Sequence, residues 1–117
     1  MNTLNALTEE ELCTMINLHG RSTGLPMNIW LGPRGHARHA ARIKVQMDHR
    51  AKFDLENLAV VSVETDLPEI IEGELSANDL EFVSRYIALN REAILDHWNE
   101  TTDGVELARA LKPLPAK

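Results

Sequence analysis

Residues 76–98 read SANDLEFVSRYIALNREAILDHW, and this stretch decides the fold class. Ser76 is a residue type favoured just before a helix, where its hydroxyl accepts a hydrogen bond from an unpaired backbone amide. Apolar residues then recur three and four positions apart, which places them on one face of a helix. That apolar stripe consists of Leu80, Val83, Ile87, Ile94 and Trp98, reinforced by Tyr86, Ala93 and Leu95. The spacing therefore predicts a long helix from Ser76, packed through this stripe against another layer.

Asn90 interrupts the apolar stripe. Its position leaves two structures open, either one long helix or two helices over residues 77–89 and 91–99. Beyond them, Thr101 to Gly104 has the composition of a turn, and residues 105–112 are expected to form a last helical turn before Pro113.

The chain before this helix has the period of β-strands. Residues 41–47, ARIKVQM, alternate without a fault between apolar and polar side chains, which predicts a half-buried strand with an exposed basic face. Residues 27–31 are a short apolar run bounded by proline and glycine, residues 53–64 alternate in part, and residues 69–72 are a shorter candidate. We therefore predict an antiparallel sheet of three or four strands, crossed on one face by the long helix, in an α+β fold.

A short amino-terminal helix is predicted over about residues 8–19. Thr8 and Glu11 form a capping-box pattern, and Leu12, Met15 and Ile16 follow at helical spacing before Gly20. The full prediction is a single α+β domain over residues 1–117, with flexible ends at 1–6 and 113–117.

Composition narrows the class of protein. The 117 residues suffice for one core, and 44% of them are apolar. No apolar run reaches the ~20 residues of a membrane span, and the first residues lack the features of a signal peptide, so we expect a cytoplasmic protein that does not enter a membrane. Cys13 is the only cysteine. It allows no internal disulfide and no thiolate zinc site, and we interpret it as a small core residue.

The net charge of −6 conceals a separation of charge along the chain. Residues 34–52 contain six basic residues and one acid, whereas residues 53–117 contain fourteen acids and five basic residues. Such a separation creates a field that can steer an anionic partner or a second copy of the chain.

Three segments of the carboxyl-terminal half form a recognisable series: EGELS at 72–76, NREAILDHW at 90–98 and LKPL at 111–114. With these segments the chain resembles a bacterial domain-of-unknown-function family of small cytosolic proteins. In that family a proline-rich loop ends in His-x-His. Here residues 30–39, WLGPRGHARH, occupy the equivalent place with a single proline and with the histidines one residue further apart. The resemblance covers about residues 27–114. It implies an origin in loci that look like toxin–antitoxin pairs.

The basic loop and strand allow three chemical interpretations. The first is binding of an anionic surface, because arginine forks match phosphate and carboxylate oxygens. The binding residues under this interpretation are Arg34, His36, Arg38, His39, Arg42, Lys44 and Arg50. Trp30 could stack on a base if it were exposed, although we expect Trp30 and Trp98 to be mainly structural.

The second interpretation is catalytic. It makes His36 and His39 the general base and general acid of a small nuclease or toxin, with Arg38 stabilising phosphoryl charge. The third is a metal site built from His36, His39, His49 and Asp48, which the surrounding arginines oppose, so no metal and no cofactor is predicted.

The functional hypothesis is a non-catalytic interaction module of a toxin–antitoxin-like or phage and host-defence system. Its expected partner is nucleic acid or a protein of a defence or toxin complex, and the charge separation also permits a homodimer. A histidine-dependent nuclease is the alternative.

Overall fold

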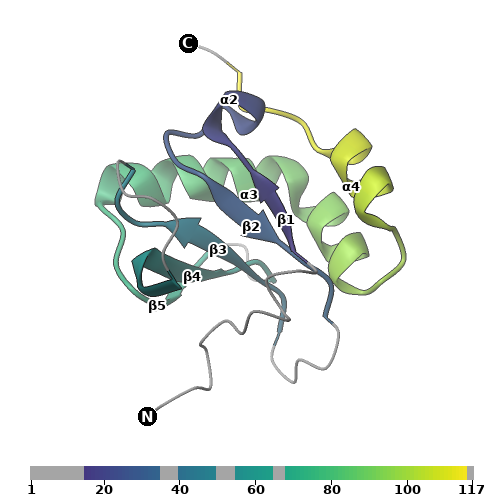
Figure 1. The fold of residues 1–117 in the computed structure, drawn as a ribbon, viewed down its shortest axis with the longest axis horizontal. Coiled ribbons are helices and arrows are strands. Elements are labelled where there is room, and N and C mark those ends of the chain that lie inside the picture. The colour runs from purple at the N-terminus through teal and green to yellow at the C-terminus, as the bar shows by residue number, and fades with distance from the viewer. Residues whose placement is uncertain (1–14, 35–39, 50–54, 65–67, 116–117) are drawn as a thin grey trace.

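The computed structural model describes residues 15–34, 40–49, 55–64 and 68–115. Within these ranges the fold is α+β, as predicted, with five strands rather than three or four (Figure 1). The strands are β1 (Ile16–Leu18), β2 (Ile29–Leu31), β3 (Arg42–Gln46), β4 (Leu58–Ser62) and β5 (Ile70–Glu72). The helices are α2 (Gly20–Thr23), α3 (Ala77–Trp98), α4 (Gly104–Ala110) and the 3-10 turn η1 (Leu55–Asn57).

The strands form an antiparallel meander in the order β1-β2-β3-β4-β5. Ile29 lies opposite Val45 on β3, and Val45 lies opposite Ala59 on β4. Between β4 and β5 the register shifts at Val60 and Val61, so the edge strand β5 is irregular. Irregular, short edge strands hinder pairing with other chains.

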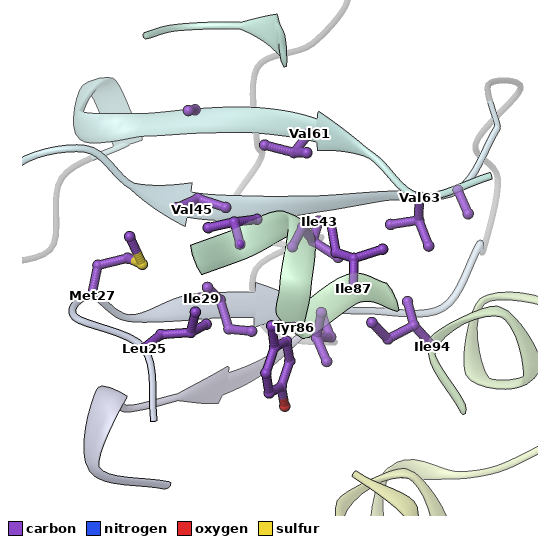
Figure 2. Packing of buried hydrophobic residues seen from close by; sticks show 14 of the residues in the cluster. Leu25, Met27, Ile29, Ile43, Val45, Val61, Val63, Tyr86, Ile87 and Ile94 are labelled. Carbon is purple, nitrogen blue, oxygen red and sulfur yellow. The ribbon is translucent and has the colours of Figure 1, made fainter. Parts of the chain in front are cut away.

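The core lies between α3 and one face of the sheet. Alternate residues of the three central strands turn to this face, and Figure 2 shows them gathered with Ile87 and Ile94 of α3. The buried strand residues are Ile29, Leu31, Ile43, Val45, Ala59 and Val61. They meet Val83, Tyr86, Ile87, Ile94 and Trp98 of α3. The two-residue period of the strands gives the sheet one apolar face, and the three-to-four-residue period gives α3 another. These two apolar faces pack against each other.

The long helix begins as predicted and runs without a break. The Ser76 hydroxyl accepts a hydrogen bond of 3.0 Å from the backbone N–H of Asp79. Of the two structures left open by Asn90, the chain adopts the single helix, Ala77–Trp98.

Asn90 sits inside the helix because its side chain holds the carboxyl-terminal segment. Its amide nitrogen donates to the Lys112 carbonyl (2.9 Å) and to the Tyr86 carbonyl (3.1 Å). Its Oδ1 accepts from the Lys112 N–H at 2.7 Å. Asn90 therefore pairs with the backbone of Lys112 in both directions, as a strand would, while it is only 3% exposed.

The segment after Lys112 continues onto α2. The Leu114 N–H donates to the Thr23 carbonyl at 2.8 Å, and the Leu114 side chain is buried. Gly24 has φ of 80°, and a Cβ there would lie 2.8 Å from the Leu114 carbonyl oxygen, so both the backbone angle and the close approach require glycine. We expected a flexible end from residue 113, yet the packed chain extends to Leu114. Residues 116–117 lie outside the described residues.

The amino-terminal helix is a wrong prediction over its last residues. Ile16 and Leu18 belong to β1, where they pair with Leu31 and Ile29 across the edge of the sheet. A three-residue segment with an apolar, a polar and an apolar residue is compatible with both a helix and a strand. Here its pairing with β2 makes it a strand. Gly20, expected to end a helix, instead begins α2. Residues 8–14, with the capping box, lie outside the described residues.

Replacing Ile87 by Ala should lower the free energy of unfolding by about 2–5 kcal/mol, because it removes a fully buried side chain between α3 and the sheet. Leu89→Ala is the matched control, since Leu89 is 43% exposed on the same helix. Chemical denaturation of both variants checks this. Equal midpoints would refute the packing of α3.

Asn90→Ala should destabilise the protein by about 1–3 kcal/mol, because it leaves two backbone groups of Lys112 without their partner. The control is Asn78→Ala, at an exposed position in the first turn of α3. Amide hydrogen exchange at Lys112 should also accelerate in Asn90→Ala. An unchanged exchange rate there would show that the Asn90 pair does not hold the segment.

Candidate functional site

Two of the basic residues that the structure describes, Arg34 and Arg42, lie at one end of the β2–β3 hairpin. Because β2 and β3 are antiparallel, the residues after Leu31 and those before Arg42 lie at the same end. Arg34 is exposed there, and Arg42 is half-buried opposite Ser62 of β4. The Arg34 N–H donates to the Trp98 carbonyl at 2.8 Å. The last turn of α3 therefore anchors the start of the predicted basic loop.

The basic face of β3 is not exposed, which corrects the prediction for Lys44. Its neighbours across the strands are Trp30 and Val60. Lys44 is 9% exposed, and these two neighbours are 4% and 2% exposed. Strict alternation predicts correctly that Lys44 points away from Ile43 and Val45, but it carries no information about how the second face is covered. Lys44 is therefore not an exposed contact residue.

Both tryptophans are structural, as expected. Trp98 is 8% exposed and belongs to the main core, whereas Trp30 lies on the second face of the sheet beside Lys44. Stacking on a base requires an open ring face, which a buried Trp30 does not offer. The stacking alternative for Trp30 is therefore set aside.

Four of the predicted site residues, His36, Arg38, His39 and Arg50, lie outside the described residues, so their roles stay predictions. Of the residues considered for a metal site, Asp48 and His49 are described. Asn57 holds the backbone of Asp48, accepting from its N–H at 2.9 Å and donating to its carbonyl at 3.2 Å. Among the described residues no three histidine, cysteine or acidic side chains converge.

His49 instead joins the loop after β3 to the start of α3. Its Nε2 lies 2.8 Å from Oδ2 of Asp79, and the side chains are 35% and 14% exposed. β3, five residues or about 16 Å long, separates this pair from the Arg42 end of the hairpin. Sequence reasoning missed the pair because 30 positions separate its members, although an acid in the first turn of a helix is a recognisable signal.

His97 is the other histidine with a defined role. Its Nδ1 lies 3.1 Å from the Thr102 carbonyl, and a carbonyl only accepts, so Nδ1 carries the hydrogen. The ring is 6% exposed, and its Nε2 has no hydrogen-bond partner within the described chain. His97 therefore fixes the turn between α3 and α4 from inside the fold.

Comparison of the chain with protein-family models, with curated proteins and with solved structures gave no match. The site is therefore assessed on its own geometry. In the described ranges, no helix has both the length and the apolar content that crossing a membrane requires.

The His49–Asp79 pair should behave as a surface ion pair. A double-mutant cycle with His49→Ala and Asp79→Ala should give a coupling energy of about 0.2–1 kcal/mol that falls with added salt. Denaturation of the four proteins in low and high salt measures it. A coupling that salt does not change would contradict the exposed geometry.

Proposed function

We propose that this protein is a non-catalytic interaction module of a toxin–antitoxin-like or phage and host-defence system, acting in the cytoplasm. Its contact surface is the loop end of the β2–β3 hairpin, and nucleic acid is the favoured partner. An acidic protein surface, including the acidic part of a second copy, is the alternative partner.

The distribution of charge over the fold supports this proposal most. The described residues before Leu55 carry four basic side chains, Arg21, Arg34, Arg42 and Lys44, against the single acid Asp48. The described residues from Leu55 onward carry twelve acidic and four basic side chains. An anion is therefore repelled by most of the fold and attracted to the hairpin side.

Binding requires less of the structure than catalysis does. Arg34 is exposed and Arg42 half-buried at the same hairpin end, and arginine forks bind phosphate oxygens without further machinery. The alternative, a nuclease using His36, His39 and Arg38, needs histidines convergent on one phosphate. These three residues lie outside the described ranges, so the alternative stays a prediction. Homodimer formation stays a prediction of the charge separation.

Replacing Arg34 and Arg42 together by Ala should weaken binding of a mixed-sequence DNA duplex roughly tenfold at physiological salt. It should also reduce the slope of log K against log salt by up to about two, because each lost phosphate contact accounts for about 0.9. Fluorescence anisotropy over a series of salt concentrations measures both quantities, and an RNA of equal length tests the preference between nucleic acids.

The matched control is the double variant Arg85→Ala and Arg109→Ala, which removes two exposed arginines from the helices. It should bind as the wild type does. Equal losses in the two double variants would mean that only net charge matters, and wild-type affinity in the Arg34 and Arg42 variant would contradict the proposal. Nuclease activity lost on replacing His36 and His39 would favour the alternative.

A further inference from the structure

A cavity of about 250 Å³ is lined by residues of β1, α2, α3, α4 and the segment that follows α4. Leu18 of β1, Ser22 of α2, Tyr86 of α3 and Ala108 of α4 contribute to its wall. The segment held by Asn90 closes it with Leu111, Lys112 and Pro113. At about 30 Å³ for each water-sized group, the cavity has room for about eight non-hydrogen atoms.

Tyr86 presents an unused polar group to this cavity. Its side chain is 1% exposed, and no hydrogen bond of the described residues engages its hydroxyl. Figure 2 shows the ring directed away from β3 and β4 with the oxygen outermost. Burial raises the pKa of Tyr86 to about 12, so the hydroxyl keeps its proton and serves as a donor at neutral pH. A hydroxyl in the cavity wall can donate a hydrogen bond to an acceptor bound there.

The charge of the residues that line the cavity favours an acceptor that is itself negatively charged. None of the eight lining residues is acidic, although the chain has a net charge of −6, and Lys112 is the one charged residue among them. The Lys112 side chain takes part in no ion pair of the described residues, and its backbone alone is used by Asn90. Ser22 adds an exposed hydroxyl, while Leu18, Leu111 and Pro113 supply apolar surface.

We propose that this cavity binds a small organic monocarboxylate, with the carboxylate at the Tyr86 hydroxyl and Lys112 and the aliphatic part against Leu18 and Leu111. Apolar walls with a few donors are the usual composition of a small-molecule site. The site is independent of the hairpin surface. None of the residues that line the cavity belongs to the proposed hairpin surface.

Hexanoate, with eight non-hydrogen atoms, is the probe. Titration of the full chain should shift the backbone amide resonances of Ser22 and Leu111 saturably, with a Kd on the order of 1 mM, as expected for a ligand of this size. Hexanol and hexylammonium test the carboxylate, and both should bind at least roughly tenfold more weakly, because a charged hydrogen bond is lost.

Tyr86→Phe keeps the ring and removes the donor, so hexanoate binding should weaken roughly tenfold. Lys112→Met should have a similar effect, and Arg109→Ala, one position from Ala108 and outside the lining, should have none. Lys112→Met and Ser22→Ala change exposed positions and carry the test if Tyr86→Phe loses stability. No saturable shift in the wild type, equal binding of hexanol, or wild-type affinity in both the Tyr86 and Lys112 variants would overturn the site.

Discussion

The structure depends on the burial of one helix face against one sheet face. Ile87 of α3 is fully buried in the same cluster as Ile43 and Val61, and no other element of the described chain is as long as α3. The Ser76 cap fixes where the helix begins. Polar groups of α3 also hold other segments of the chain. The Trp98 carbonyl accepts a hydrogen bond from the Arg34 N–H, and the Asn90 side chain donates one to the Lys112 carbonyl. The packing of α3 therefore positions these polar contacts.

This arrangement separates the molecule into regions with different chemistry. One face of the sheet is covered by α3 (Figure 1). The exposed residue Arg34 follows β2 and is bonded through its N–H to the carbonyl of Trp98, the last residue of α3. Most of the acidic residues that the structure describes lie from Leu55 onward in the sequence. The carboxyl-terminal segment encloses the Tyr86 cavity between α2 and α4. The same helix thus supports the proposed anion surface at one end and the proposed carboxylate site on its flank.

Local patterns predicted the parts of this fold that local physics determines. Alternation in residues 41–47 predicted β3, and Ser76 predicted the start of α3, because strand period and capping act within a few residues. The role of Asn90 could not be predicted, since its partner Lys112 lies 22 positions away. The same limit hid the His49–Asp79 pair. Lys44 shows a second limit, because a period identifies the side of a sheet but not what covers it.

Native-state amide hydrogen exchange at graded denaturant tests the dependence on α3 most directly. If packing of α3 on the sheet holds the fold together, the amides of Val83 and Ile87 and those of β3 should exchange with one free energy, equal to that of global unfolding. The Lys112 amide, held by Asn90 at the periphery, should exchange at or below that value. Exchange of the α3 amides at a distinctly lower free energy than those of β3 would show a sheet that persists without the helix, and would contradict the account.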